Sequence, residues 1–241
     1  MDPPSRFFLA LFAVFAFLFE GAASAAAQSR WFGPAEDVPT ISIRPFLMVS
    51  DEKFTATNTF HAVFGNATAP FWGGGVQVVV WSGRVYAELG AWRILHKNAE
   101  LVGERVFRSD GKNYRLGIPL RSRIKPFEVT AGYRFNISRV LVPYVGAGVG
   151  SYRYTEESDF SESSENLDLS HNGVVFQTGA EYRVHNWVRI AGDVRYNHVP
   201  GILGTGGISQ LLVASADPGV TPSHEKDLGG WTVGLKVSVG R

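Results

Sequence analysis

Charged residues stand at alternate positions within several apolar segments, and their types suit ion pairing better than catalysis. Alternate residues of a β-strand share one face, so these side chains would project together from one side of a sheet. If that sheet closes around a narrow interior, opposite charges are expected to pair, because an isolated buried charge is very costly. We interpret them as a salt-bridged lumen network made of Arg44, Glu88, Glu128, Arg134, Glu181, Arg183, Arg189, Asp193, Arg195 and Lys236, with Arg153 as a further candidate.

Motifs for catalysis and cofactor binding are incomplete. His224-Glu225 begins a zinc-protease pattern, but Leu228 stands where the second histidine is required. The glycines of residues 146–150 lack the spacing of a dinucleotide-binding loop and lie in an expected strand. No Gly-x-Ser-x-Gly elbow occurs. The sequence therefore predicts no enzyme, no cofactor, and no catalytic or metal-binding residues.

The composition excludes several classes of protein. The chain has 241 residues, a formal net charge of +1 and no cysteine. A near-neutral chain lacks the basic stripe that nucleic acid would require, so no nucleic-acid partner is expected. The absence of cysteine excludes a disulfide framework, a thiolate metal site and a lipidated-cysteine anchor.

The first segment has the pattern of an export signal. Phe7–Phe19 is an unbroken apolar run, too short for a membrane-spanning helix, and small residues follow it. Cleavage is expected after Ala25 or after Ala27. We therefore predict a cleaved signal peptide over residues 1–27 and one domain over residues 28–241.

The remaining sequence alternates between apolar and polar residues with the period of β-strands. Residues 231–240 are the clearest example, with Trp, Val, Leu, Val and Val at the odd positions and polar or small residues at the even ones. Similar patterns predict eight strands near residues 39–50, 71–81, 84–95, 124–136, 141–155, 173–184, 187–198 and 230–240.

The connections between these strands alternate between long and short. Long segments lie near residues 51–70, 96–123, 156–172 and 199–229, whereas the intervening turns are tight. Bacterial transmembrane barrels have long external loops and short periplasmic turns. A hairpin near residues 104–123 would give ten strands if it entered the membrane, but Glu104, Arg105 and Arg108 favour a solvated hairpin and therefore eight strands.

The apolar face is expected to contact lipid and the charged face to line the interior. The apolar sets of the clearest strands contain no charge, which a lipid face requires, and large aromatic residues gather near strand ends. The proposed girdle residues are Phe71, Trp72, Trp92, Phe127, Tyr152, Tyr154, Phe176, Tyr196 and Trp231 at the loop ends, and Trp81, Phe135, Tyr144, Tyr182 and Trp187 at the turn ends. The alternative is a secreted soluble barrel with its apolar face inside.

Short motifs resemble strands of small bacterial outer-membrane β-barrel proteins of the OmpA-like and OmpX-like eight-stranded class. They are Ala131–Phe135, Pro143–Gly150 followed by Tyr152-Arg153-Tyr154, Gly179–Arg183 and Gly229–Leu235. The resemblance implies an all-β fold, an eight-stranded antiparallel up-and-down transmembrane β-barrel, in a Gram-negative outer membrane. Such chains usually end on an aromatic residue that the barrel-insertion machinery recognises, whereas this sequence ends Val239-Gly240-Arg241.

From this resemblance we expect a monomer with a closed lumen, four extracellular loops and a structural or surface-interaction role. Its partners would be outer-membrane lipid, lipopolysaccharide and the insertion machinery, with the cations of residues 97–125 as candidate contacts for lipopolysaccharide phosphates. Two other functions stay open. One is a narrow, anion-preferring passive channel, and the other is a lipid A-modifying enzyme that would use His198, Ser209 and Glu225.

Overall fold

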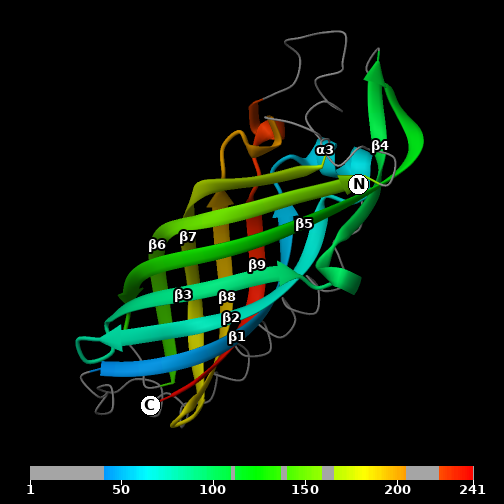
Figure 1. The fold of residues 1–241 in the computed structure, drawn as a ribbon. Helices are drawn as coiled ribbons and strands as arrows, with labels where there is room; N and C mark the ends of the chain where they lie inside the picture. The colour runs from blue at the N-terminus through cyan, green and yellow to red at the C-terminus, as the bar shows by residue number, and fades with distance from the viewer. Residues whose placement is uncertain (1–40, 110–111, 137–139, 159–165, 205–222, 241) are drawn as a thin grey trace.

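The computed structural model describes residues 41–109, 112–136, 140–158, 166–204 and 223–240, and it consists mainly of long antiparallel strands (Figure 1). The expected signal peptide, residues 1–27, lies outside these residues. The strands are β1 (Ile41–Phe54), β2 (Thr68–Val80), β3 (Val85–Ile94), β4 (Leu101–Ser109), β5 (Lys112–Arg134), β6 (Leu141–Ser158), β7 (Leu167–His185), β8 (Val188–His198) and β9 (Gly230–Val239). The helical segments are α3 (Thr57–Phe64), η1 (Lys97–Ala99), η3 (Ile202–Gly204) and η4 (Ser223–Lys226).

Eight of the strands close into a barrel. Neighbouring strands pair in the order β3-β2-β1-β9-β8-β7-β6-β5, and β3 also pairs with β5, which closes the ring. All of these pairings are antiparallel. The predicted eight-stranded up-and-down barrel is therefore confirmed.

Strand β4 stands outside the ring. It pairs with the first half of β5, from Lys112 to Ser122, and forms a hairpin that projects beyond the barrel wall (Figure 1). The second half of β5 pairs with β3 and enters the ring. The alternative of ten membrane strands is thus wrong, because a lipid-embedded strand cannot leave an unpaired edge.

The barrel wall has an apolar outer face and a polar inner face, as predicted. Leu47 is 66% exposed and Val237 is 39% exposed, whereas Arg189, Asp193 and Arg195 are each at most 3% exposed. A soluble barrel would show the reverse arrangement. Trp81, Phe135 and Trp187 are exposed at the turn end of the wall, and Phe127, Phe176 and Trp231 are exposed at the loop end.

Part of the predicted aromatic girdle is wrong. Phe71, Trp92, Tyr144, Tyr152 and Tyr154 are buried inside the barrel. On β6 the odd-numbered residues face outward, so the tyrosines at even positions point inward. These rings fill the lumen instead of marking the membrane surface.

Candidate functional site

The ten residues predicted to line the lumen lie in two clusters at different depths of the barrel. Nine of the ten are at most 3% exposed, and Arg183 is half-buried at the turn end. We call Glu88, Glu128, Asp193, Arg195 and Lys236 the mid-barrel cluster. Arg44, Arg134, Glu181, Arg183 and Arg189 form the turn-end cluster.

Arg195 is the centre of the mid-barrel cluster. Its guanidinium group lies 2.7 Å from an oxygen of Asp193, 2.8 Å from Glu88 and 2.9 Å from Glu128. Lys236 Nζ lies 3.0 Å from Glu88 and 3.4 Å from Asp193. These residues come from β3, β5, β8 and β9, so the ion pairs connect opposite sides of the barrel wall.

Neutral donors complete the coordination of these carboxylates. Glu128 accepts hydrogen bonds from Trp92 Nε1 at 3.0 Å and from the Tyr152 hydroxyl at 2.8 Å. The Tyr144 hydroxyl donates to Asp193, and Arg195 also stacks over the Trp92 ring, 4.6 Å from its centroid. The interior is therefore a dense ionic and aromatic plug.

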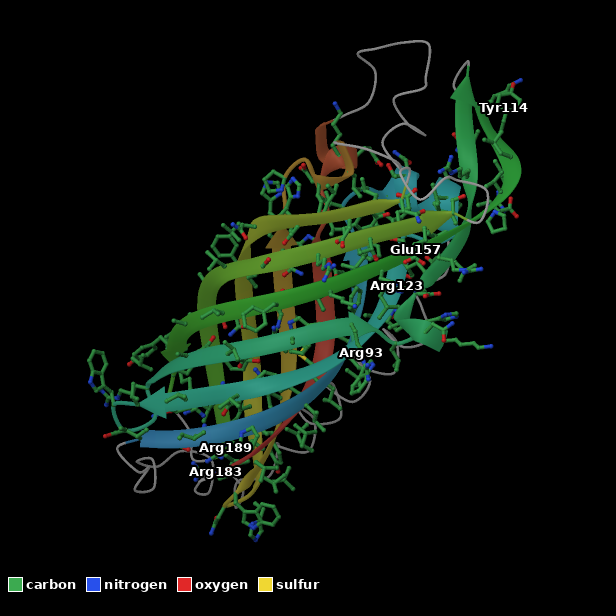
Figure 2. All side chains as sticks on the ribbon, in the orientation of Figure 1. Arg93, Tyr114, Arg123, Glu157, Arg183 and Arg189 are labelled. Carbon is green, nitrogen blue, oxygen red and sulfur yellow. The ribbon has the colours of Figure 1, made fainter. Side chains whose placement is uncertain are left out.

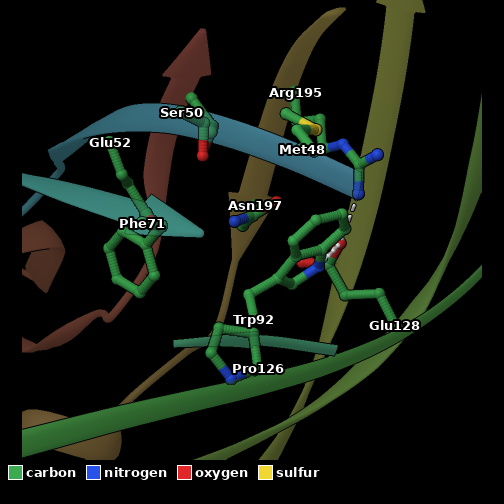
Figure 3. A pocket seen from close by; sticks show the side chains of 10 residues that line it. Met48, Ser50, Glu52, Phe71, Trp92, Pro126, Glu128, Arg195 and Asn197 are labelled. Carbon is green, nitrogen blue, oxygen red and sulfur yellow. Dashed lines mark hydrogen bonds and ion pairs between the residues drawn. The ribbon is translucent and has the colours of Figure 1, made fainter. Parts of the chain in front are cut away.

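A small cavity remains beside this plug (Figure 3). Its volume is about 20 Å³, room for one water molecule and too little for a solute. Its lining includes Glu52 from β1, Trp92 from β3 and Asn197 from β8. The cavity also borders Glu128 and Arg195 of the mid-barrel cluster.

The turn-end cluster gathers arginines around one carboxylate. Glu181 accepts a hydrogen bond from Arg134 and lies 3.8 Å from Arg44 Nη1. Arg134 also donates to the Gly83 carbonyl at 2.6 Å, and Arg189 donates to the Gly240 carbonyl at 2.6 Å. Backbone carbonyls at this end of the barrel therefore hold two of the arginines in place.

Arg153, the further candidate for the lumen, is wrongly placed by the sequence prediction. It faces outward on β6, and its Nε donates to Asp168 on β7 at 2.9 Å. This hydrogen bond lowers the pKa of Asp168 below its ordinary value. The glycines of β6 leave one face of that strand without side chains, so the sequence pattern does not indicate which face is polar.

The loop end of the barrel is covered by an apolar cap. Helix α3 lies over this end, and η3 and η4 adjoin it (Figure 1). The cap is a continuous buried cluster that includes Phe54, Phe60, Val63, Ile202, Leu203 and Leu228. The sequence pattern predicts a loop here and not this helix, because the segment TNTFHAVF is short.

Glu225 connects η4 to the start of α3. Its carboxylate accepts hydrogen bonds from the backbone nitrogens of Asn58 at 3.1 Å and Thr59 at 2.9 Å, and from the Thr59 hydroxyl at 2.7 Å. These are orphan donors of the first helical turn. Glu225 thus holds the cap in place.

The hypothetical lipid A-modifying set is not assembled in the part of the chain that the structure describes. Ser209 lies outside the described residues. Glu225 is engaged with α3, whereas His198 Nδ1 lies 3.9 Å from Asp227. Among the described residues, no three His, Asp or Glu side chains are grouped so that they could hold a metal ion.

A row of cations lies just above the outward apolar belt on three neighbouring strands. Lys125 on β5 is the register partner of Arg153 on β6, and Arg93 on β3 lies two residues beyond the pair Ala91–Phe127. Arg93 stacks on the Trp72 ring, 3.9 Å from its centroid. Arg93 and Lys125 are both exposed, and in the described part of the chain neither is in an ion pair.

Arg123 lies on β5, two residues from Lys125 and closer to the β4–β5 hairpin. It forms ion pairs with Glu100 and with Glu157, the latter at 3.0 Å. Figure 2 shows Arg93, Arg123 and Glu157 in succession toward the base of the β4–β5 hairpin, with Tyr114 near its tip. The cation excess predicted over residues 97–125 is therefore partly neutralised, by Glu100 from the same segment and by Glu157 from β6.

Helices of the described residues are all too short or too polar to cross a membrane. A family model described as "Outer membrane protein beta-barrel domain" matches residues 13–210. No curated protein matches the sequence.

Several solved structures resemble this chain. The N-terminal β-barrel domain of OprF from Pseudomonas aeruginosa is 13% identical to this chain, with a TM-score of 0.45. The match covers 83% of this chain and 97% of the OprF domain. Neisserial surface protein A shows 13% identity, a TM-score of 0.46 and the same coverages. Ail of Yersinia pestis, solved with the heparin analogue sucrose octasulfate, shows 14% identity and a TM-score of 0.43 over 85% of this chain and 100% of its own.

Proposed function

This chain belongs to the outer membrane protein β-barrel domain family and resides in the bacterial outer membrane, and on that premise we propose that it is a closed, non-conducting scaffold. In this role the barrel anchors an extracellular surface, formed by the cap and the β4–β5 hairpin. The observation that carries the proposal is that buried ion pairs of the mid-barrel cluster cross the interior while the apolar cap covers the loop end.

The mid-barrel cluster supports closure because its charges occupy the cross-section of the barrel. An eight-stranded barrel is only just wide enough for side chains to fill. Arg195 and Lys236 reach carboxylates on other strands, and the aromatic rings of Trp92 and Tyr144 fill the space between them. An ion entering the lumen would have to break these buried pairs.

The alternative of an anion-preferring channel has one supporting observation, the arginines of the turn-end cluster. Rings of cationic side chains favour anions in a pore. However, the mid-barrel cluster above them contains three carboxylates and two cations, all buried. This level would repel an anion that had passed the arginines, so the geometry favours a closed barrel over an anion pathway.

The surface role follows from what lies beyond the membrane. The hairpin of β4 and β5 presents exposed residues such as Val102, Tyr114 and Leu116. A rigid barrel carrying such a projection is a common arrangement for binding surfaces. The barrel ring itself has no open edge in the bilayer, which is consistent with a monomer.

The row formed by Arg93, Lys125 and Arg153 is suited to contact the outer leaflet. Arginine and lysine bind phosphate groups through charge-assisted hydrogen bonds. The row lies two residues from the exposed Phe127 along β5, toward the loop end, where we expect lipid phosphates to meet the apolar belt. We therefore place the lipopolysaccharide contact at this row.

Electrical recording from planar bilayers tests the closed lumen. The folded protein should give no discrete conductance steps, and neither should Glu225→Gln, because the mid-barrel cluster closes the lumen without the cap. Steps of reproducible size in the unaltered protein would refute the proposal. Anion selectivity of such steps would establish the channel instead.

A further inference from the structure

Glu52 is a buried carboxyl group at the junction between the barrel and its cap. It is 5% exposed on β1 and lines the small cavity together with Phe71 and Trp92 (Figure 3). Both aromatic residues belong to the buried cluster that forms the cap. The same cavity borders Glu128 and Arg195 of the mid-barrel cluster, so Glu52 lies where the apolar cap meets the ionic interior.

No cation compensates the charge that Glu52 would carry if it were ionised. In the described part of the chain Glu52 forms no ion pair, and the charge acting on it is that of Glu128, another carboxylate. Arg195 borders the same cavity, but its guanidinium group is already paired with three carboxylates of the mid-barrel cluster. Because a buried charge beside a like charge is strongly unfavourable, we expect the Glu52 carboxyl group to be neutral.

The other described strands around Glu52 provide no further charge at the cavity. Strands β2, β3 and β9 contribute only uncharged side chains to its lining. On β6, Tyr152 is the titratable group that interacts with Glu52, and its hydroxyl donates to Glu128. On β1 itself, Asp51 and Lys53 precede and follow Glu52, and neighbouring residues of a strand project to the opposite face. The charges facing Glu52 are therefore those of the mid-barrel cluster.

An unpaired amide oxygen beside the cavity also points to a proton on Glu52. The Oδ1 atom of Asn197 is buried and has no hydrogen-bond donor, although Asn197 is the side chain that hydrogen-bonds Glu52. A neutral carboxyl group carries one O–H donor, whereas a carboxylate only accepts. The cavity has room for one water molecule, which can relay this donor to the amide oxygen. A protonated Glu52 therefore supplies the donor that Asn197 lacks.

Glu52 lies beyond the apolar belt, at the loop end of the barrel. Its neighbour Lys53 is a charged and exposed residue, and the register partner of Lys53 in β9 is the exposed Trp231 of the loop-end girdle. Burial, together with the nearby charge of Glu128, raises the pKa of Glu52 to about 8. A carboxyl group in water ionises at a much lower pH, so rising pH favours any state in which Glu52 reaches water.

Phe54 connects this carboxyl group to the helix of the cap. It lies two residues beyond Glu52 on β1, is buried, and stacks on Phe60 of α3 with the ring centroids 4.0 Å apart. The Phe54 backbone nitrogen also donates to the Ala67 carbonyl at 2.9 Å, just before β2 begins. A shift of β1 that carried an ionised Glu52 toward water would therefore disturb the packing that holds α3.

We propose that Glu52 is a proton-binding site that couples the cap to the pH of the medium. With the proton bound, the neutral carboxyl group lets the cap pack on the barrel, and its ionisation at alkaline pH loosens the cap. A proton is favoured over a metal cation because the Arg195 guanidinium group borders the same cavity and would repel a metal ion. The ion pairs of the mid-barrel cluster do not involve Glu52, so this response does not depend on a closed lumen.

Hydrogen–deuterium exchange of the α3 amides tests the coupling in the folded, detergent-solubilised protein. A raised carboxyl pKa makes the closed state less stable as the pH rises from the ordinary pKa to the raised one, with no further loss above it. After correction for the intrinsic exchange rate, the α3 amides should therefore exchange at least about tenfold faster at about pH 8 than at about pH 5. A corrected rate that does not change over this interval would overturn the proposal.

Two variants assign this change to Glu52. Glu52→Gln keeps the size of the side chain and cannot ionise, so its α3 amides should lose most of the pH dependence. Glu157→Gln is the matched control, because it removes a half-exposed carboxylate that pairs with Arg123 outside the cavity, and it should exchange like the unaltered protein. Equal pH dependence in Glu52→Gln and the unaltered protein would show that another group controls the cap.

Infrared spectroscopy detects the proton directly and does not depend on the stability of a variant. A protonated carboxyl group has a C=O stretching band that a carboxylate lacks. In the unaltered protein and in Glu157→Gln this band should be present at about pH 6 and lost by about pH 9, and it should be reduced in Glu52→Gln. If Glu52→Gln does not fold, titration of the band in the unaltered protein decides the question. Absence of the band at about pH 6 would show that Glu52 is ionised in the native state and would refute the proposal.

Discussion

Replacing Arg195 with methionine should destabilise the barrel more than any exposed charge substitution. Arg195 bonds Asp193, Glu88 and Glu128 within 2.9 Å, and all four side chains are buried. Removing one partner of a buried ion pair costs about 3–5 kcal/mol, because the remaining charge is left uncompensated. Here Lys236 still reaches Glu88 and Asp193, but Glu128 retains only neutral donors. We therefore expect a loss of about 3–5 kcal/mol in the free energy of unfolding.

Urea unfolding from phospholipid vesicles, followed by tryptophan fluorescence, measures this loss. Arg153→Met is the matched control, since it removes an arginine from an exposed pair with Asp168, and its midpoint should barely move. The double variant Arg195→Met/Glu128→Gln should recover part of the lost stability, because it removes the stranded carboxylate. If Arg195→Met unfolds at the same urea concentration as Arg153→Met, the mid-barrel cluster does not stabilise the fold.

Two further predictions concern the outer face of the barrel. Leu89→Arg places a charge within the apolar belt and should cost about 2–4 kcal/mol of stability in vesicles. Its control, Ser170→Arg, places the same charge above the belt and should cost little. Equal urea midpoints for the two variants would contradict the assigned lipid face. The double variant Arg93→Gln/Lys125→Gln should retain several-fold less lipopolysaccharide after detergent extraction and washing, while Arg115→Gln on the projecting hairpin should retain as much as the unaltered protein. Equal retention by all of them would argue against the cation row as the contact.

The ring of strands was predictable because each barrel strand separates a lipid-facing side from an interior side. That constraint imposes the two-residue period, and each of the eight predicted strands coincides with a strand of the barrel. The strands extend further at the loop end, as in β5, which begins at Lys112 instead of near residue 124. Outside the bilayer the wall no longer needs an apolar face, so the pattern that predicts a strand disappears while the backbone pairing continues.

The errors arose where one face of a strand carries little information. In β6 the residues 146, 148 and 150 are glycines on the inner face, and they make room for neighbouring side chains. A Cβ atom on Gly146 would lie 2.3 Å from the Tyr86 hydroxyl oxygen. Without a polar signal on that face, the sequence pattern predicts Arg153 in the lumen and Tyr152 and Tyr154 in the girdle, and the structure places all three on the opposite face. The register of β6 against β5 and β7 resolves the assignment.

The grouping of the interior charges could not be read from the sequence. Alternation identifies which residues face inward, but the height of each residue depends on strand tilt and register, which set the partner across the barrel. Arg44 and Arg134 are far apart in the chain, yet both lie beside Glu181. The cap could not be predicted from the sequence either, because Glu225 in η4 accepts hydrogen bonds from residues of α3 that lie more than 160 positions earlier in the chain.

The apolar cap and the mid-barrel cluster are stabilised by different forces and should respond to different perturbations. The cap is held by apolar burial around Phe60 and by the carboxylate of Glu225 on the helix terminus. The mid-barrel cluster is held by ion pairs within the membrane-spanning wall, where salt screens charges weakly. Loss of the cap would therefore rearrange the extracellular surface without opening the barrel, whereas loss of Arg195 would weaken the wall beneath an intact cap. This separation would allow the surface to vary without changing the mid-barrel cluster, as the proposed scaffold role requires.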